Sequence, residues 1–246
     1  MSKSIIIIPS RLGAKRLPNK PLLTINDIPM IIHVMNRAKE SGIGEVIVAT
    51  PDQKIFDLVE QMSGKAILTK KNHSTGSDRI YEALEKISDG SIDFLINLQG
   101  DMPNIDPNDI KNLDYLMRKN KYQMGTLASK VKNIEEFQNT NIVKVETFKN
   151  LHDSNFPKTK DFFRKMKNTN KKNIYHHIGV YAFSRSALSK YVKLSRTKNE
   201  IERKLEQMRA LDNNIEIRVA LSKSLPLGID TKENFLSVKK TMEYKG

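Results

Sequence analysis

A cluster of basic residues follows the first hydrophobic segment of the chain. Residues 5–8 are four consecutive isoleucines, and the loop after them contains Arg11, Arg16 and Lys20. Gly13 in the same loop gives the backbone the freedom to curl around an anion. Several cations around one anion are what a polyphosphate requires, although the loop lacks the glycine and lysine spacing of a P-loop. We therefore expect phosphate binding here, with a solvated basic loop as the alternative.

Two aspartates stand where a carboxylate could bind a metal ion. Asp101 follows a hydrophobic segment in a Gly-Asp turn, and Asp230 precedes the last expected helix. Mg²⁺ usually takes one or two carboxylates and completes its shell with water and substrate phosphates. If both aspartates meet the basic loop, they form a nucleotidyl-transfer site in which the metal bridges the phosphates. The alternatives are a turn residue that bonds its own backbone for Asp101 and a helix N-cap for Asp230.

Three further motifs are weaker. Residues 72–79 carry hydroxyl side chains at an expected helix start, where they either cap the helix or contact a base or ribose. His176 and His177 are adjacent on an expected strand, so they face opposite ways and are poorly placed to share a metal ion. Residues 206–209 lie on the polar side of an expected helix, where a solvated face is the simplest interpretation.

Alternating strands and helices position the residues of the first half. Continuous aliphatic runs closed by polar loops indicate buried strands, and apolar spacings of three and four indicate helices. Such βαβ units form a mostly parallel sheet, and ligands bind outside the carboxyl ends of its strands. The expected strands are 4–9, 45–50, 65–69 and 93–99, and the expected helices follow Pro29, follow Pro51 and cover 77–87.

The second half of the chain is less regular. No internal repeat or long linker separates two domains, so we expect one domain over residues 1–246 with an inserted segment at about 140–195. The expected elements are strands at 141–148, 177–183 and 215–220, one helix with Ile201, Leu205, Met208 and Leu211 on its apolar face, and a last helix after Asp230.

The composition excludes several classes of protein. The chain has 246 residues and no cysteine, which excludes a disulfide scaffold and thiolate chemistry. No apolar run approaches the roughly 20 residues of a membrane span, and the first run is too short for a signal peptide. We expect a cytoplasmic protein without membrane insertion.

The formal charge of +14 raises nucleic-acid binding as an alternative of another class. Only 11 of the 42 basic residues are arginine, the preferred reader of bases and phosphates. Residues 158–172 carry seven basic side chains against Asp161 alone. Single-strand binding needs aromatic rings between the cations, and Phe162 and Phe163 are the only ones in this segment. We expect no nucleic-acid partner.

Together the motifs resemble those of one enzyme family over nearly the whole chain. The matching segments are 8–22, 29–34, 46–50, 76–79, 97–101, 177–181, 205–211 and 228–231. They resemble the 3-deoxy-manno-octulosonate cytidylyltransferases, the CMP-Kdo synthetases of bacterial lipopolysaccharide biosynthesis. Single motifs of this set are shared with other sugar nucleotidyltransferases, whereas the last three together are much more specific to this family.

The resemblance implies an α/β, Rossmann-like nucleotidyltransferase fold. Its mostly parallel, mixed sheet would be covered by helices on both faces, with an inserted segment for dimerisation and sugar binding. The implied enzyme is a homodimer that uses Mg²⁺ to couple CTP and 3-deoxy-D-manno-octulosonate (Kdo), giving CMP-Kdo and pyrophosphate. By that analogy the anomeric hydroxyl attacks the α-phosphate, and catalysis is mostly positioning and charge neutralisation.

The resemblance also assigns roles to residues. The implied catalytic residues are Arg11, Lys20, Asp101 and Asp230, of which the two aspartates hold Mg²⁺. The implied nucleotide-binding residues are Pro9, Ser10, Arg11, Arg16, Lys20, Ser77, Asp78, Arg79 and Gln99. The implied sugar-acid contacts are Gln99, His177, Tyr181, Glu206 and Gln207.

Two departures from the family pattern leave the sugar open. Met102 stands where the family commonly has Glu, and residues 148–158 lack the arginine of the family's sugar-contact strand. An 8-amino-Kdo or another related acid is an alternative substrate. A sialic acid is a further alternative, although residues 205–211 argue against it. We hypothesise that cations of residues 158–172 attract the anionic sugar acid in place of the missing arginine.

Overall fold

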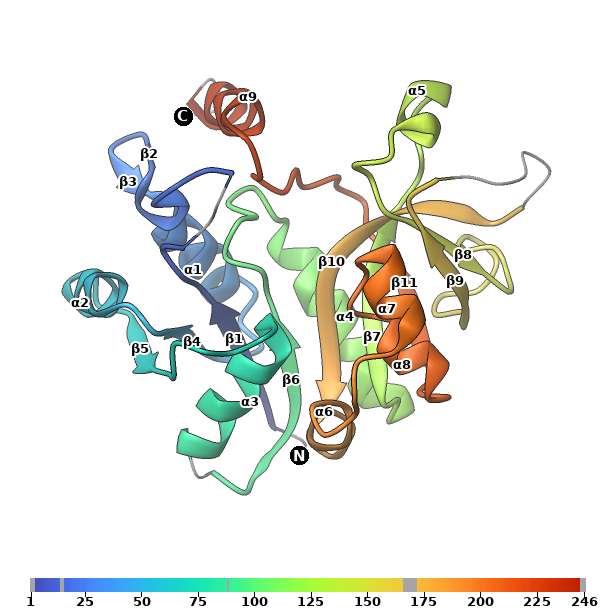
Figure 1. The fold of residues 1–246 in the computed structure, drawn as a ribbon, viewed down its shortest axis with the longest axis horizontal. Coiled ribbons are helices and arrows are strands. Elements are labelled where there is room, and N and C mark those ends of the chain that lie inside the picture. The colour runs from blue at the N-terminus through green and yellow to red at the C-terminus, as the bar shows by residue number, and fades with distance from the viewer. Residues whose placement is uncertain (1–2, 14–15, 88, 166–171, 244–246) are drawn as a thin grey trace. The chain divides into compact units, whose positions relative to one another are not determined.

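The computed structural model describes residues 3–13, 16–87, 89–165 and 172–243 (Figure 1). Its internal contacts divide the chain into two compact units, Met1–Lys111 with Pro226–Gly246, and Asn112–Leu225. The boundary falls inside helix α4 (Pro107–Asn120). The expectation of a single domain with an insertion stays a prediction, because contacts alone do not test whether either unit folds independently.

A parallel sheet forms the centre of the first unit. Strands β1 (Lys3–Pro9), β4 (Gly44–Thr50), β5 (Lys65–Leu68) and β6 (Ile92–Asn97) are joined in the order β6-β1-β4-β5. The four isoleucines of β1 are at most 1% exposed, as expected for a strand covered on both faces. Helices α1 (Met30–Glu40), α2 (Gln53–Gln61) and α3 (Gly76–Ile87) connect the strands, and all the elements predicted here are confirmed.

A small second core holds the ends of the first unit together. The 3₁₀ helix η1 (Lys20–Leu22) leads into the hairpin of β2 (Thr24–Ile25) and β3 (Ile28–Pro29), and the C-terminal helix α9 (Lys232–Glu243) lies against β2 (Figure 1). The buried side chains of this core are Ile25, Met30, Ile229 and Val238. The segment before α9 is therefore anchored beside the loop that follows β1.

The second unit is a mixed sheet. Strand β7 (Met124–Ser129) lies between β11 (Ile217–Leu221), with which it pairs parallel, and β10 (Ile174–Ser184), with which it pairs antiparallel. Strand β10 also pairs antiparallel with β8 (Lys144–Thr147). Strand β9 (Thr159–Phe163) pairs with β8. The helices of this unit are α5 (Ile134–Gln138), α6 (Arg185–Tyr191), α7 (Lys198–Arg203) and α8 (Met208–Asp212). The α/β, mixed and mostly parallel sheet predicted for the chain is confirmed.

Two parts of the second unit differ from expectation. The single helix predicted around Ile201–Leu211 is wrong, because Lys204 takes a left-handed conformation with φ of 53° and separates α7 from α8. Ile201 is 54% exposed, whereas Leu205 and Met208 are buried. The basic segment, residues 158–172, contains strand β9, which was not predicted. Residues 166–171 of this segment lie outside the described part of the chain.

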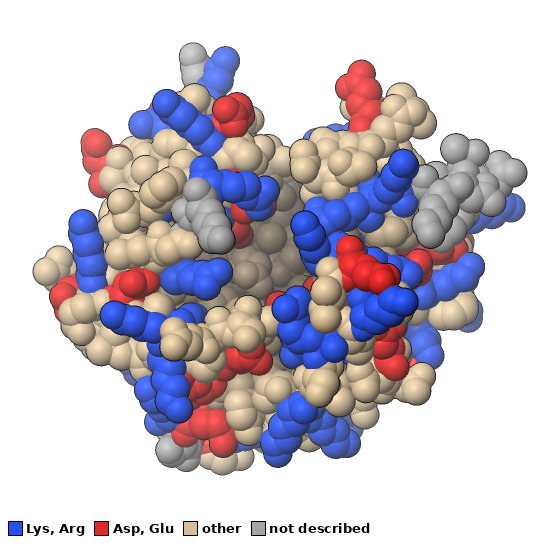
Figure 2. Space-filling view, viewed as in Figure 1, with Lys and Arg blue, Asp and Glu red and all other residues tan. Residues whose placement is uncertain are grey.

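No helix among the described residues combines the length and the apolar character needed to cross a membrane. Basic side chains are spread over the face shown in Figure 2, with acidic and uncharged side chains between them.

Candidate active site

Lys20 brings the two predicted metal-binding carboxylates together in the first unit. Its Nζ donates to Asp101 Oδ2 at 2.8 Å, to the Ile229 carbonyl at 2.7 Å and to Asp230 Oδ1 at 3.4 Å. Arg16 Nη2 lies 2.9 Å from Asp230 Oδ2. Because one ammonium contacts both carboxylates, their oxygens can be no farther apart than the sum of those two contact distances.

Close backbone packing places Asp101 at this position. A Cβ on Gly100 would lie 3.1 Å from the Pro9 carbonyl oxygen and 3.4 Å from Ile31 Cδ1, so the turn after β6 passes β1 with little room for a side chain. The Ile229 amide then donates to the Asp101 carbonyl at 3.0 Å. The two aspartate-bearing segments are thus joined through their backbones as well as through Lys20.

Asp230 is not the N-cap of the last helix, and that alternative is wrong. The Asn234 amide donates to Thr231 Oγ1 at 3.3 Å, so Thr231 caps α9. The Asp230 side chain is 51% exposed and faces the cations Arg16 and Lys20. Its carboxylate is therefore available to a ligand rather than committed to the helix terminus.

The oxygens around Lys20 fit a hard cation. Two carboxylates and a carbonyl are ligand types that Mg²⁺ accepts, and the Lys20 ammonium occupies the place between them. No group of three or more His, Cys, Asp or Glu that could hold a metal occurs in the described part of the chain. A metal ion here would therefore complete its shell with water and ligand oxygens.

The loop after β1 is held from two sides. The Leu12 amide donates to Asp52 Oδ2 at 2.8 Å, and the Pro9 ring lies against Gly76 at the start of α3. The Ser10 amide donates to the Ala49 carbonyl at 2.9 Å, while its buried Oγ has no hydrogen-bond partner among the described residues. Such an orphaned hydroxyl is a candidate for contact with a ligand. Arg11, next along, is exposed.

A capping box begins α3 and uses one of the predicted nucleotide contacts. The Asp78 amide donates to Thr75 Oγ1 at 3.2 Å, and the Asp78 carboxylate accepts from the Thr75 amide at 3.0 Å and from its hydroxyl at 2.8 Å. Ser77 is buried within the first turn. Asp78 therefore positions the helix start in this structure.

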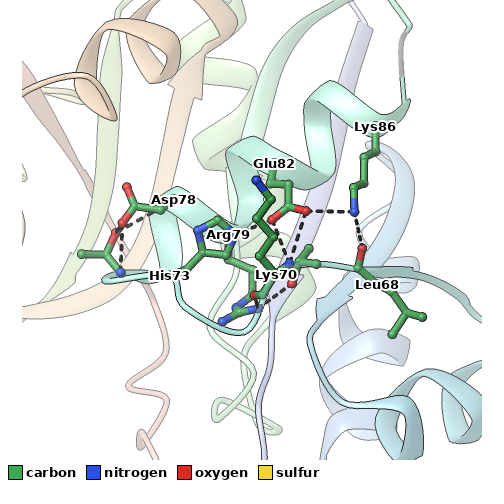
Figure 3. A network of polar contacts seen from close by, with 9 residues as sticks. Leu68, Lys70, His73, Asp78, Arg79, Glu82 and Lys86 are labelled. Carbon is green, nitrogen blue, oxygen red and sulfur yellow. Dashed lines mark hydrogen bonds and ion pairs between the residues drawn. The ribbon is translucent and has the colours of Figure 1, made fainter.

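Arg79 lies in a buried polar network (Figure 3). Its Nη1 donates to Thr69 Oγ1 at 2.5 Å and to the Lys70 carbonyl at 3.0 Å. Burial and the nearby Arg11 lower the pKa of the guanidinium below its ordinary value. The side chain thus ties α3 to the segment that follows β5.

Glu82 is a second anchor of that segment, and sequence reasoning missed it. Its carboxylate accepts from the Lys70 amide at 3.0 Å, from Lys86 Nζ at 2.8 Å and from the ring of His73 (Figure 3). Burial opposes ionisation of Glu82, but these donors outweigh it and lower its pKa to about 2. The spacing of four between Glu82 and Lys86 was the available signal.

His177 and Tyr181 lie side by side on β10 in the second unit. Their ring centroids are 5.5 Å apart. Burial lowers the pKa of His177 to about 3, with smaller contributions from His176 and Arg164, and burial raises that of Tyr181 well above its ordinary value. His176 pairs with Glu136, whereas His177 contacts Thr126, so the two histidines do have separate surroundings.

Glu206 and Gln207 occupy the turn between α7 and α8. The Tyr191 hydroxyl donates to the Glu206 carbonyl at 2.9 Å. Arg209, 3% exposed, forms a two-point ion pair with the equally buried Glu200 at 2.9 and 2.8 Å. The solvated face predicted for residues 206–209 is wrong for Gln207 and Arg209, which are both buried.

Gln99 and the basic segment, both predicted to contact the sugar acid, each form hydrogen bonds or ion pairs with nearby groups. Gln99, in the first unit, donates to Asn97 Oδ1 at 3.3 Å. In the basic segment, Lys160 pairs with Glu146 at 2.8 Å and Arg164 Nη1 donates to the Asn141 carbonyl at 3.1 Å. The segment's charge is therefore partly compensated by neighbouring groups.

Comparisons with known proteins agree on one family. The family profile described as cytidylyltransferase matches residues 5–217. The 3-deoxy-manno-octulosonate cytidylyltransferase of Brucella canis is 41% identical over 94% of this chain and 92% of its own length. The protein of the same name from Rhodopseudomonas palustris is 37% identical over 99% of both chains.

Solved structures show the same relationship. A CMP:2-keto-3-deoxy-manno-octonic acid synthetase complexed with CTP superposes over 100% of both chains with a TM-score of 0.90 and 34% identity. The UTP-bound UGPase of Acinetobacter baumannii, at 14% identity and a TM-score of 0.71 over 100% of this chain and 95% of its own, shares the fold. By profile, sequence and structure, the chain belongs to the cytidylyltransferase family, among the 3-deoxy-manno-octulosonate cytidylyltransferases.

Proposed function

We propose that the protein couples CTP and Kdo to give CMP-Kdo and pyrophosphate for lipopolysaccharide biosynthesis. The observation that carries this proposal is the meeting of Asp101, Asp230 and Lys20 around one cation position beside Arg16. The names of the relatives that match nearly the whole chain support the same substrates. Localisation to the cytoplasm remains a prediction.

The basic loop supplies charge neutralisation for the triphosphate. Arg11, Arg16 and Lys20 would pair with its oxygens, and the unpartnered Ser10 hydroxyl would add a hydrogen bond. Asp101 and Asp230 would hold Mg²⁺, which neutralises phosphate charge and orients the pyrophosphate leaving group. Since Lys20 now lies between the two carboxylates, it would turn toward the phosphates when the metal binds.

The reaction then needs little covalent work from the protein. The anomeric hydroxyl of the sugar acid forms a bond to the α-phosphorus, the bond from that phosphorus to the bridging oxygen of the β-phosphate breaks, and the hydroxyl proton leaves to solvent. Arg11 and Lys20 stabilise the charge that develops on the transferred and leaving phosphates. The remaining contribution is to hold the reactants in line.

The segment that follows β5, to which Arg79 and Glu82 are hydrogen-bonded, and the adjacent start of α3 would recognise the nucleoside. Ser77, Asp78 and Arg79 lie at the start of α3, and Pro9 of the phosphate loop contacts this helix start. The phosphate loop and the α3 start are therefore adjacent within one unit, as a nucleotide requires. Gln99 would contribute to both the nucleotide and the sugar contacts.

The second unit would supply most of the sugar-acid contacts. His177, Tyr181, Glu206 and Gln207 are the proposed ligands there. His177 contacts the buried Thr126 and the Tyr181 ring, and the Glu206 carbonyl accepts from the buried Tyr191. Arg164 and Lys165 would attract the carboxylate of the sugar. If Arg164→Gln together with Lys165→Gln leaves the KM for the sugar acid unchanged, this role of the basic segment is refuted.

One assay tests the proposed function. Pyrophosphate release is measured with CTP and Mg²⁺ in separate reactions containing Kdo, 8-amino-Kdo or a sialic acid. We expect release with Kdo, and release only with 8-amino-Kdo or only with a sialic acid would reassign the substrate. Absence of release with all three contradicts the enzyme assignment.

We also propose a homodimer. Ile201 on α7 is 54% exposed and is a candidate for an interface contact. Sedimentation equilibrium should then give about twice the 28.2 kDa of one chain, and a monomer at assay concentration would contradict the dimer without affecting the proposed reaction.

A further inference from the structure

Strand β10 is shortened where it carries His177 and Tyr181. His177 lies opposite Ala128 of β7 and Tyr181 lies opposite Thr126, so four steps along β10 match two steps along β7. Four residues of regular strand would span roughly 13 Å, yet the two ring centroids are 5.5 Å apart. The extra residues form a bulge that brings both rings to one place.

The Thr126 hydroxyl lies at this bulge and is fully buried. Its Oγ1 is 2.8 Å from the Val180 carbonyl oxygen and 3.2 Å from that of Ile178. It is also 3.1 Å from His177 Nε2. A threonine hydroxyl has one hydrogen, and the shortest contact of Oγ1, 2.8 Å, is to the Val180 carbonyl, which can only accept, so that hydrogen is directed to the bulge carbonyls rather than to the ring.

The remaining contact determines the protonation of the histidine ring. Because the Thr126 hydrogen is used by the carbonyls, its oxygen can only accept from the ring, and Nε2 must carry the hydrogen. The pKa of His177, lowered to about 3 by burial, keeps the ring neutral near pH 7. A neutral ring protonated at Nε2 has a lone pair on Nδ1.

Nδ1 has no hydrogen-bond partner among the described residues, whereas two aromatic rings pack against the imidazole. Phe162 contacts the ring edge-to-face at a centroid distance of 5.0 Å, and Tyr181 lies on another side at 5.5 Å. The ring is therefore held in place by Thr126 and two aromatic neighbours, with one acceptor atom unused.

We propose that Thr126 is a positioning residue that fixes His177 in the Nε2-protonated tautomer, so that Nδ1 accepts a hydrogen bond from a hydroxyl of the sugar acid. This inference rests on the proposed function for the identity of the ligand. A charged ring or the other tautomer would present a donor at Nδ1, so the arrangement selects a hydroxyl and disfavours a carboxylate oxygen at this atom.

The tautomer is measured without any substrate. Long-range ¹H–¹⁵N correlation spectra of the full chain with ¹⁵N-labelled histidine distinguish the two ring nitrogens, and His177→Asn identifies the His177 signals among the five histidines. We expect hydrogen on Nε2, an unprotonated Nδ1 and no titration between pH 5 and 8. Hydrogen on Nδ1, or a charged ring at pH 6, overturns the proposal.

Binding and kinetics test the acceptor. Adding the sugar acid should move the Nδ1 resonance, whereas CTP alone should not. An unmoved Nδ1 resonance in a protein that releases pyrophosphate with that sugar overturns the acceptor role. Absence of pyrophosphate release with every sugar acid would instead refute the proposed function, while the tautomer measurement would still stand.

Matched variants separate positioning from packing. Thr126→Val removes the hydroxyl at nearly constant volume, and Thr126→Ser keeps the hydroxyl but removes a methyl group. We expect Thr126→Val to lose the single tautomer and to raise the KM for the sugar acid by about three- to tenfold, with the KM for CTP unchanged. Thr126→Ser should keep the tautomer and the KM. If Thr126→Ser raises the KM for the sugar acid more than Thr126→Val does, the hydroxyl does not have this role.

Discussion

At the scale of single residues, the proposed chemistry depends on a carboxylate pair held by one lysine. Asp101 and Asp230 each contact Lys20, and Arg16 adds a second cation on Asp230. Only Asp101 is mostly covered by the protein, with 25% of its side chain exposed against 51% for Asp230. Because both side chains are at least partly exposed, replacing either aspartate removes a charge without creating a cavity in the hydrophobic core.

Asp101→Asn and Asp230→Asn should each lower the rate of pyrophosphate release by about 100-fold or more, because each loses one of two metal-binding charges. The rate is measured at saturating CTP and Kdo. Circular dichroism should show that both variants stay folded. Asp27→Asn is the matched control, since Asp27 is an exposed turn residue with φ of 59° that asparagine also tolerates. Near-normal turnover in either site variant would remove the metal assignment.

The lowered pKa of Glu82 predicts a loss of stability in acid. A carboxyl with a folded pKa of about 2 and an unfolded value of about 4.3 stabilises the folded state fully above pH 5 or so. That contribution falls as the pH drops through the interval between those two values. Glu82→Gln should therefore lower the free energy of unfolding by about 1–3 kcal/mol at pH 7 and by roughly half as much at pH 3.

Urea unfolding at the two pH values measures this difference. Glu85→Gln on the same helix α3 is the control, because Glu85 is exposed. An equal difference between wild type and Glu82→Gln at both pH values would show that Glu82 acts through packing rather than through its charge.

At the scale of elements, the turn between α7 and α8 is positioned by buried partners. The Tyr191 ring packs against Phe183 at a centroid distance of 5.7 Å and lies under the Arg209 guanidinium at 4.9 Å, while its hydroxyl holds the Glu206 carbonyl. The proposed sugar contacts of this turn therefore depend on a side chain that is not itself among the proposed sugar ligands.

Tyr191→Phe should raise the KM for the sugar acid by about two- to tenfold, because the Glu206 carbonyl loses its donor while the ring packing is kept. The KM for CTP should stay the same, and steady-state kinetics with each substrate varied in turn distinguish the two. Tyr115→Phe is the control, since Tyr115 is 51% exposed. A change in the KM for CTP alone would contradict the assignment of this turn to the sugar.

The Glu200–Arg209 pair should be a major stabiliser of the same element. Both side chains are at most 3% exposed, and removing Arg209 would leave the buried Glu200 carboxylate with only the half-exposed Arg196, whose Nε lies 3.0 Å away. Arg209→Met should therefore lower the free energy of unfolding by about 3–5 kcal/mol, measured by urea denaturation. Arg37→Met, which breaks a half-exposed pair with Glu40, should change it by less than about 1 kcal/mol.

At the scale of the whole molecule, the formal charge of +14 is the feature that could indicate a nucleic-acid partner. Basic residues on the visible face alternate with acidic and uncharged ones (Figure 2). Two lysines of the basic segment have acidic partners. Lys158 Nζ lies 3.6 Å from Glu216 Oε2, and Lys160 pairs with Glu146. The excess charge therefore does not by itself imply a polyanionic partner.

Binding to labelled single-stranded and duplex DNA should be weak and non-specific. Fluorescence anisotropy at 150 mM salt should show a Kd no tighter than about 1 μM. Tighter binding at that salt concentration would restore the nucleic-acid alternative.

Prediction from the sequence was most successful where local patterns and burial agree. The strands of the first unit were predicted because isoleucine and valine runs have to be covered on both faces. The helix predicted around Ile201 failed because Leu205 and Met208 keep a helical spacing while Lys204 leaves the helix. Strand β9 escaped prediction because charged residues interrupt its apolar positions.

The sequence by itself determined the order of strands and helices in the first unit and the chemical types in its loops, because hydrophobic periodicity and turn residues act locally. Only the tertiary structure decided that Lys20 meets carboxylates 81 and 210 positions away. It also decided that Thr126 contacts a ring 51 positions away. Such meetings depend on the packing of distant segments, such as α9 on β2, and on a bulge whose register no local pattern specifies.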